Sequence, residues 1–383
     1  MLNIQDISNC VILRKKLHQK PELANFEKVT SALIKEYMTA LMPDNMITDI
    51  GGTGIAIGFG SKNTGPTIML RCELDALPIN ECIDIPHASC HPGISHKCGH
   101  DGHMAILAAV AHYFSVNKPE KGRVILLFQP AEETGEGARK IVSSSEFEQI
   151  NPDYIFSLHN VPGYPKGQVL IKPDTFCCAS RGLIIFLRGT PAHAAQPETG
   201  ISPVLAINEL ITAIHTIPET VTRGSELTFA TIVGVDIGAK AFGTSPEKGY
   251  LYVTLRSDSD ENMNRLVSYL ENKTTEISTR YRLQPSLDYE DVFDATVNSP
   301  EAVSIIETAL AGEPVIRLDR PFRWSEDFGL FNQKKCGAMF GLGAGTTSPA
   351  LHSANYDFQD ELIECGSRYF IKIVLHCFDM AIK

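Results

Sequence analysis

The segment Lys97–His103 is the richest group of potential metal ligands in the chain. Cys98 and His100 stand two residues apart, and the glycines at positions 99 and 102 let the backbone fold closely around a bound ion. A thiolate and an imidazole can bind the same borderline metal ion, such as zinc. Taken alone, the pattern is also compatible with a buried thiol beside a helix-capping turn.

Two adjacent carboxylates, Glu132 and Glu133, follow the apolar run Arg123–Phe128. This run is predicted to be a strand, and ligands collect at the carboxyl ends of strands in open α/β sheets. Consecutive side chains of an extended chain point apart, so one carboxylate is predicted to bind a metal and the other to face a bound water as a base. A solvated turn is the alternative.

Two histidines could complete such a site. His159 follows the predicted strand Asp153–Leu158, and His352 lies near the end of the chain. A single histidine is more often an ordinary core or surface residue. Successive predicted strands nevertheless bring cysteine, histidine and glutamate side chains toward one edge of a sheet, which favours a catalytic metal site.

A structural zinc knuckle is the competing interpretation of the same region. Cysteines and histidines alternate there, at Cys82, His87, Cys90, His91, His96 and Cys98. Structural zinc modules usually present their cysteines as Cys-x-x-Cys pairs, and this spacing is missing. The pattern therefore favours the catalytic site.

Size and composition limit the class of protein. A chain of 383 residues that is 43% hydrophobic predicts two domains with a sizeable core. The net charge of -11 argues against a nucleic-acid partner. No apolar run is long enough to span a membrane, and residues 1–23 lack the apolar core of a secretion signal. These features predict a cytoplasmic protein, in which the ten cysteines are reduced thiols.

The fold class follows from the alternation of strand and helix patterns. The first part is predicted to be α/β, with a mixed, mainly parallel sheet and helices on both faces. Its predicted elements are strands Thr67–Arg71, Arg123–Gln129 and Asp153–Leu158 and helix Met104–Phe114. An inserted α+β unit follows, with strands Leu183–Arg188, Leu227–Val235 and Tyr250–Arg256 and helices Pro203–Ile217 and Glu261–Arg280. We expect a catalytic domain of residues 1–179 and 294–383, and a lid of residues 180–293.

The ordered motifs resemble the bimetallic amidohydrolases and metallopeptidases that include aminoacylases, hippurate hydrolases, N-acetyl-diaminopimelate deacetylases and auxin-conjugate hydrolases. The resemblance covers nearly the whole chain and implies a zinc-exopeptidase-like catalytic domain with a ferredoxin-like lid. The matching stretches are Leu17–Leu23, Arg71–Pro78, Cys98–His103, Gln129–Glu133, Leu158-His159, Ala192–Ala195, Ser325–Phe328, Leu351-His352 and Tyr356–Phe358.

The resemblance implies two divalent metal ions, of zinc, manganese, cobalt or nickel, with five protein ligands. In such enzymes Glu132 would be the base that takes a proton from a metal-activated water, and the hydroxide would attack the amide carbonyl. Asp75 would orient a ligand imidazole, and Asp327 could act similarly. The implied ligands are Cys98, which would bridge the two ions, and His100, Glu133, His159 and His352.

The resemblance also assigns roles within the lid. His193 would reach across a homodimer interface to stabilise the developing oxyanion. Arg256 would bind a substrate carboxylate, although an ordinary surface arginine is the alternative. The chain departs from its relatives at Gly243, where they usually have asparagine, and at Glu73, where many have aspartate. Because of these departures, the resemblance does not determine the identity of the substrate.

The leading prediction is a hydrolase that cleaves the amide bond of small N-acyl amino acids, without a nucleic-acid or membrane partner. One alternative keeps the site but uses Cys98 as a covalent nucleophile with a histidine base. Another is a relative without catalytic activity that binds a metabolite. Retention of Glu132 beside all five implied ligands weighs against this second alternative.

Overall fold

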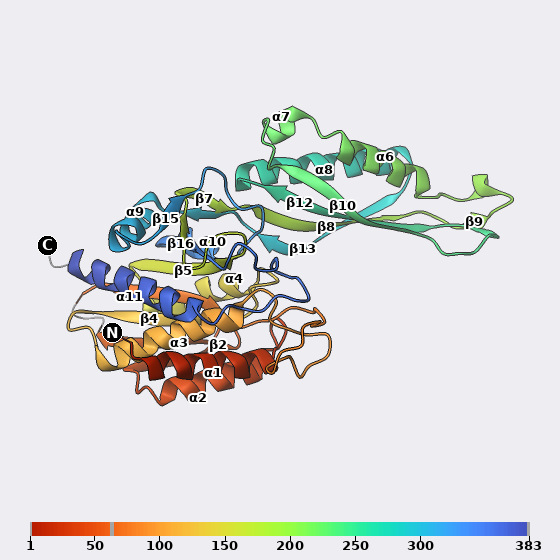
Figure 1. Ribbon diagram of the computed structural model, residues 1–383. Helices are drawn as coiled ribbons and strands as arrows, with labels where there is room; N and C mark the ends of the chain where they lie inside the picture. The colour runs from red at the N-terminus through yellow and green to blue at the C-terminus, as the bar shows by residue number, and fades with distance from the viewer. Residues whose placement is uncertain (1, 62–64, 381–383) are drawn as a thin grey trace. The chain divides into compact units, whose positions relative to one another are not determined.

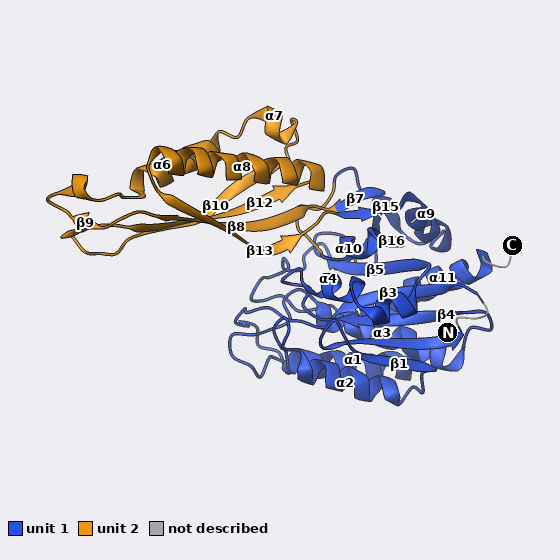
Figure 2. Ribbon diagram, turned by 180° about the vertical axis from the view of Figure 1, so that it is seen from behind, with its two compact units in different colours: residues 1–176, 296–320, 327–383 blue, residues 177–295, 321–326 orange. Residues whose placement is uncertain are grey.

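The computed structural model describes residues 2–61 and 65–380, which form two compact units (Figure 2). Unit 1 contains residues 1–176, 296–320 and 327–383, and unit 2 contains residues 177–295 and 321–326. The segment 321–326 was expected in the catalytic domain. It belongs to unit 2, where the backbone N–H of Cys178 donates to the carbonyls of Phe322 at 3.0 Å and Trp324 at 3.2 Å.

Unit 1 is built on an eight-stranded sheet (Figure 1). The central strands β4, β3, β5 and β16 are parallel neighbours, and β6 pairs with β15 in parallel. The pairs β1–β2, β2–β4 and β6–β16 are antiparallel, so the predicted mixed, mainly parallel sheet is confirmed. In spatial order the strands are β1 (Asn45–Ile50), β2 (Gly54–Ser61), β4 (Gly122–Gln129), β3 (Thr67–Glu73), β5 (Tyr154–Val161), β16 (Cys336–Gly343), β6 (Val169–Ile171) and β15 (Val315–Arg317).

Both faces of this sheet are covered, which explains the nearly continuous apolar strands. Ile68 and Leu70 of β3 join the main core, whereas Met69 between them faces the other side and is equally buried. Helices α1 (Ile4–Gln19), α2 (Lys28–Thr39), α3 (His100–Val116), α9 (Pro300–Ala309) and α11 (Leu362–Met380) contribute to the main core. Helices α4 (Gly137–Val142), α5 (Ser145–Ile150) and α10 (Gly329–Asn332) pack outside it, with the Phe147 and Phe331 rings 5.7 Å apart.

Helix α3 begins four residues before the predicted Met104, directly within the ligand-rich motif. Gly99 caps it in the left-handed conformation, with φ at 101°. A Cβ atom at Gly99 would lie 2.6 Å from Oδ1 of Asn160, and one at Gly102 would lie 2.3 Å from the ring of Phe358. The two glycines therefore allow the start of α3 to pack closely against β5 and the C-terminal connection.

Unit 2 has the β-α-β-β-α-β order of a ferredoxin-like fold, and its four-stranded antiparallel sheet has the order β10-β12-β8-β13. Helices α6 (Val204–His215) and α8 (Asp260–Arg280) lie on one face of the sheet (Figure 1). The strands are β8 (Ala179–Arg188), β10 (Phe229–Ile237), β12 (Lys248–Ser257) and β13 (Gln284–Phe293). The sequence did not predict β13, because this edge strand carries exposed polar residues and Pro285 rather than an apolar run.

Short elements complete both units. Strand β7 (Asp174–Cys177) pairs with β14 (Thr296–Asn298), β9 (Ala192–His193) pairs with β11 (Thr244–Ser245), and α7 is Glu219–Thr222. Within the described residues, no helix is both long and apolar enough to cross a membrane.

Buried charges fasten α1 to the start of α3. The imidazole of His18 is completely buried, with Nδ1 2.8 Å from Oδ2 of Asp101 and Nε2 2.9 Å from Oε1 of Glu81. Arg14, one turn earlier on α1, donates to Asp101 at 3.2 Å and to Asp357 at 2.7 Å. Burial alone would lower the pKa of His18, but the Asp101 carboxylate and the hydrogen bond to Glu81 raise this pKa to about 9. A protonated imidazole can donate to both carboxylates at once.

We predict that the stabilisation provided by His18 is full below about pH 6.5, the usual histidine pKa in an unfolded chain, and is lost as the pH rises to about 9. The folded state binds the extra proton in this interval, so its stability falls with increasing pH. The measurement is the free energy of unfolding of metal-free wild type and His18→Gln between pH 6 and 9.5. The difference in the free energy of unfolding between the two proteins should shrink by on the order of 3 kcal/mol over this pH interval. A difference independent of pH would show that His18 is neutral in the folded protein.

Candidate metal centre

The five predicted ligands come from four separate segments of unit 1. Cys98 and His100 flank the start of α3, and Glu133 follows β4. His159 lies near the end of β5, and His352 lies in the connection between β16 and α11. Because the central strands run in the same direction, their carboxyl ends meet at one edge of the sheet, where these side chains gather.

The side chains form overlapping groups in which the potential ligand atoms lie within 4.8 Å of one another. Cys98 belongs to two of these groups, and its Sγ lies 3.4 Å from Nε2 of His159. Glu132, the predicted base, shares a group with His100 at the start of α3. The groups are Cys98, His100 and His159; Cys98, Glu133 and His352; and His100, Glu132 and Glu133.

The orientation of His100 fits a bound cation. Its Nδ1 lies 2.9 Å from the backbone carbonyl oxygen of Asp75, and its buried Nε2 has no hydrogen-bond partner among the described residues. This Nε2 lies 3.8 Å from a Glu132 oxygen and 3.9 Å from a Glu133 oxygen, too far for hydrogen bonds. Nitrogen and oxygen ligands lie roughly 2.0–2.2 Å from a zinc ion, so the gap has the size that a metal would bridge.

The electrostatic surroundings also favour a cation. Burial alone would lower the pKa of His100, but the nearby Asp75 carboxylate and the charges of Glu73 and Glu133 raise it to about 10. Burial holds the pKa of His159 well below its usual value, so this imidazole is neutral, as a metal ligand must be. The carboxylates therefore attract either a proton on His100 or a metal ion, and the thiol, imidazole and carboxylate donors suit a borderline divalent ion.

Asp75 connects two of the predicted ligands. Its carbonyl oxygen contacts His100, and its carboxylate Oδ2 accepts the backbone N–H of Glu133 at 2.9 Å. The other oxygen, Oδ1, is 3.6 Å from Nδ1 of His100. Asp327 lies elsewhere in the same hydrogen-bonded region, where it contacts Arg71 at 2.5 Å and Gln129 at 2.8 Å. Asp75 is thus placed to orient ligands, whereas these contacts of Asp327 join the ends of β3 and β4.

The sequence prediction that Glu132 and Glu133 point apart is wrong. β4 ends at Gln129, and Ala131 adopts a left-handed conformation with φ at 50°, so the alternation of an extended strand does not continue. Both carboxylates consequently approach the same nitrogen of His100. The turn is held by Glu27, a buried residue whose Oε1 accepts the backbone N–H of Ala131 at 2.8 Å. Sequence reasoning missed Glu27, since nothing distinguished it from a surface acid.

A chain of buried hydrogen bonds lies beside the ligands. Glu73 contacts Arg71, and its Oε2 lies 2.6 Å from Nδ1 of His103. Nε2 of His103 is 2.5 Å from Oδ1 of Asn160, whose amide donates to the hydroxyl of Tyr356 at 2.5 Å. Glu73, His100 and His103 also form a group of potential metal ligands. The motif 97–103 was the available signal for His103, although spacing alone did not separate it from the other histidines.

The zinc-knuckle interpretation is contradicted. Cys82 and Cys90 are exposed, and among residues 2–61 and 65–380 neither belongs to a group of potential ligands. His87 contacts Asp357 at 3.1 Å, and Nδ1 of His91 lies 2.8 Å from the carbonyl of Pro21. These side chains serve local hydrogen bonds rather than a shared ion.

His193 and Arg256 belong to unit 2. His193 is exposed on β9, where it pairs with Thr244 of β11. Arg256 lies on β12, and its Nη1 donates to Oγ of Ser325 at 2.6 Å. The carbonyl of Gly243 accepts the N–H of Ala194 at 3.0 Å. A Cβ atom at Gly243 would meet no atom within 4 Å, so a larger residue would fit there.

Comparison with known proteins identifies the family of this chain. The model of peptidase family M20/M25/M40 matches residues 69–376. The chain belongs to this family. An N-acetyldiaminopimelate deacetylase of Listeria monocytogenes is 31% identical over 376 residues, covering 97% of this chain and 98% of the relative. A hippurate hydrolase of Campylobacter jejuni is 28% identical over 370 residues, covering 95% of each chain.

Solved structures share the fold over almost the full length. A dinuclear metal-binding peptidase of the M20 family from Bacillus subtilis has a TM-score of 0.81 at 23% identity, covering 98% of this chain and 99% of its own. An aminobenzoyl-glutamate utilization protein from Klebsiella pneumoniae has a TM-score of 0.74 at 18% identity, covering 97% and 96%. The predicted family resemblance and fold class are confirmed, and this M20 protein is a metallo-amidohydrolase.

We predict that Asp75→Asn lowers the affinity for divalent metal by about 10–100-fold, as is typical when a residue that orients ligands is changed. Asparagine can still accept the N–H of Glu133, but it removes the negative charge beside His100. The measurement is calorimetric titration of metal-free protein with zinc.

The matched control for Asp75→Asn is Asp153→Asn. Asp153 also accepts a backbone N–H, from Thr67 at 2.8 Å, but at the start of β3 and therefore at the opposite edge of the sheet. The control should bind metal like wild type. Wild-type affinity in Asp75→Asn itself would show that Asp75 does not support the ligands.

Proposed function

We propose that this M20 protein cleaves the amide bond of small N-acyl amino acids and carries two divalent metal ions, of zinc, manganese, cobalt or nickel. The observation that carries the proposal is the convergence of two overlapping ligand groups that share Cys98. A shared thiolate is suited to bridge two ions. The names of the two relatives support the substrate class, because N-acetyldiaminopimelate and hippurate are both N-acylated amino acids. The proposed ligands are Cys98, His100, Glu133, His159 and His352.

Glu132 is the proposed general base. Bound metal ions supply positive charge that lowers the pKa of a water and polarises the substrate carbonyl. Glu132 is nearly buried, with its Oε2 3.8 Å from Nε2 of the ligand His100. At this position its carboxylate can accept a proton from the attacking water and then donate it to the departing amine nitrogen.

Two residues of unit 2 complete the proposal. Nδ1 of His193 accepts the backbone N–H of Ala195 at 3.1 Å, so Nε2 is the ring nitrogen that carries a proton. This exposed N–H is suited to stabilise a developing oxyanion, and we propose that it does so in a homodimer formed through unit 2. The planar guanidinium of Arg256 is suited to bind the substrate carboxylate, while its contact with Ser325 fixes the orientation.

One observation favours a second candidate, a cysteine-dependent amidase. Sγ of Cys98 and Nε2 of His159 lie 3.4 Å apart, a separation that also suits a thiol and its base. However, burial keeps the pKa of His159 far below its usual value, so an imidazolium that would stabilise the thiolate is disfavoured. The neighbouring Glu133 adds negative charge, which disfavours a free thiolate further. A metal ion removes both difficulties, so we favour the metal-dependent reaction.

We predict that Glu132→Gln lowers the rate of amide hydrolysis by about 10²-fold or more, because glutamine keeps the size of the side chain but cannot accept the proton. The measurement is amine release from a panel of N-acetyl and N-benzoyl amino acids, with each of the four metals. Metal content is measured in both proteins, and equal loading confines the defect to proton transfer. Wild type that is inert with every metal and substrate would refute the proposed activity.

We predict that a chelator abolishes activity, that added metal restores it, and that metal protects Cys98 from iodoacetamide. A metal-bound thiolate is not free to attack the reagent, whereas the metal-free thiol is. Mass spectrometry after brief treatment measures the modification, in a Cys82→Ser/Cys90→Ser background that removes the exposed thiols. Activity that survives chelation but is lost on alkylation of Cys98 would instead support the cysteine-dependent reaction.

A further inference from the structure

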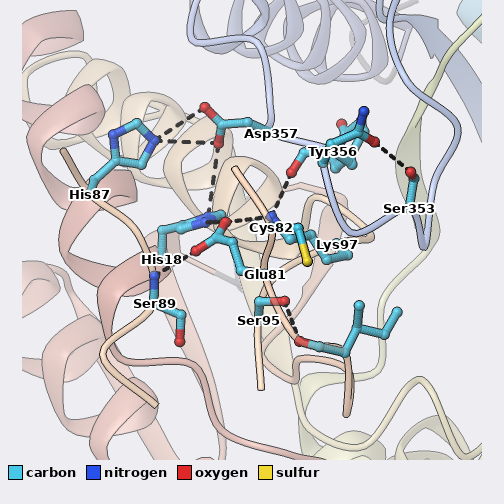
Figure 3. Close-up of polar contacts among 12 residues, drawn as sticks. His18, Glu81, Cys82, His87, Ser89, Ser95, Lys97, Ser353, Tyr356 and Asp357 are labelled. Atoms are coloured by element: carbon cyan, nitrogen blue, oxygen red, sulfur yellow. Dashed lines mark hydrogen bonds and ion pairs between the residues drawn. The ribbon is translucent and has the colours of Figure 1, made fainter. Parts of the chain in front are cut away.

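Lys97 links the two segments that carry Cys98 and His352, although its ammonium donates hydrogen bonds and cannot itself be a metal ligand. Its side chain is completely buried, and Nζ contacts the carboxylate of Glu81 and donates to the backbone carbonyl of Tyr356 at 2.7 Å (Figure 3). The backbone carbonyl of Lys97 also accepts the N–H of His352 at 2.8 Å. A lysine is seldom fully buried unless its charge is paired. The paired and buried ammonium of Lys97 therefore indicates a specific structural role.

His352 is the proposed ligand that its surroundings hold least. It lies in the connection 344–361 between β16 and α11, and its side chain is 51% exposed. Its backbone is left-handed, with φ at 63°, a conformation that a residue other than glycine keeps only when neighbouring contacts impose it. Such contacts come from the connection between β3 and α3, where Lys97 binds the His352 N–H and Cys82 donates its N–H to Ala354 at 3.0 Å.

Glu81 fixes the position of the Lys97 ammonium. Its carboxylate contacts Nζ of Lys97, Nε2 of His18 at 2.9 Å and the backbone N–H of Ser89 at 2.6 Å (Figure 3). His18 in turn contacts Asp101 at the start of α3. Glu81 therefore connects the ammonium to His18 of α1. The hydrogen bond from the ammonium to Tyr356 then fastens the C-terminal connection to this part of unit 1.

We propose that Lys97 is a positioning residue that places His352 at the metal centre. Its ammonium and its backbone carbonyl fasten the connection 352–356 to the segment that carries Cys98 and His100. The inference rests on the proposed function, in which Cys98 and His352 bind the same ion. Lys97 acts through His352 and contacts neither the ion nor the substrate. A role in fold stability alone is the competing explanation.

The test is a double-mutant cycle on metal binding. Metal-free protein is titrated with cobalt(II), with calorimetry for affinity and the visible absorption of the ion for its ligand geometry. Lys97→Met keeps the length of the side chain but removes the ammonium. This change should lower the affinity for one of the two cobalt ions by about 10–100-fold. In the His352→Ala background the same change should cause little further loss, because the ligand that it positions is already absent. The cobalt spectrum of Lys97→Met should resemble that of His352→Ala.

A control separates positioning from general destabilisation. Tyr37→Phe removes the hydrogen bond between Tyr37 and Nε2 of His112, 2.8 Å apart between α2 and α3, and leaves the connection 352–356 untouched. This variant should bind two cobalt ions like wild type. If Lys97→Met does not fold, Glu81→Gln replaces it in the double-mutant cycle, since this substitution removes the negative charge that holds the ammonium.

Three results would overturn the role of Lys97: unchanged cobalt affinity, losses that add fully with those of His352→Ala, or an equal loss in Tyr37→Phe. The cycle needs no substrate, so its result is independent of turnover. A protein that shows the predicted coupling but hydrolyses nothing would keep this inference while the proposed activity fails. Wild type that binds no pair of ions would refute the proposed metal centre itself.

Discussion

Buried opposite charges at the carboxyl edge of the unit 1 sheet constrain the segments around them. Removing one partner of a buried ion pair typically costs about 3–5 kcal/mol, because the other charge is left uncompensated. His18, Arg14 and Lys97 balance the buried carboxylates of Glu81 and Asp101 and the partly exposed carboxylate of Asp357. These residues come from α1, the connection 74–99, α3 and the C-terminal connection. The segments must keep their relative positions for each charge to stay paired, and the same segments carry Cys98, His100 and His352.

The proposed ligands are consequently held with unequal rigidity. Cys98 and His100 are buried at the start of a helix, and His159 is buried in a central strand. Glu133 lies in a turn whose shape is set by Glu27 and Asp75. The connection that carries His352 also depends on contacts with another irregular segment, and the His352 side chain is the most exposed of the five. Two ions bound at this edge would therefore differ in how firmly the protein holds them, with the ion near His352 the more easily lost.

Sequence patterns predicted the layout but not the contacts. The apolar strands β3, β4 and β5 were recognisable because burial on both faces makes them continuously hydrophobic, and their shared direction brings the motifs to one edge. The turn after β4 was misjudged, since its geometry depends on distant Glu27. Strand β13 was missed because edge strands tolerate polar residues and proline. The charges around Lys97 were not recognised either, because a buried lysine cannot be told from an exposed one by residue type.

The two departures implied by the family resemblance, at Glu73 and Gly243, differ in their structural consequences. Glu73 is longer than aspartate, but its carboxylate is engaged by Arg71 and His103, so the extra methylene is accommodated within this buried network. At Gly243 nothing crowds the missing side chain, so steric exclusion does not explain the absence of asparagine. The glycine removes an amide that could donate and accept hydrogen bonds, next to the strand pair that presents His193. A substrate that needs fewer polar contacts at this place is consistent with that loss, which directs the search for specificity to unit 2 rather than to the ligands.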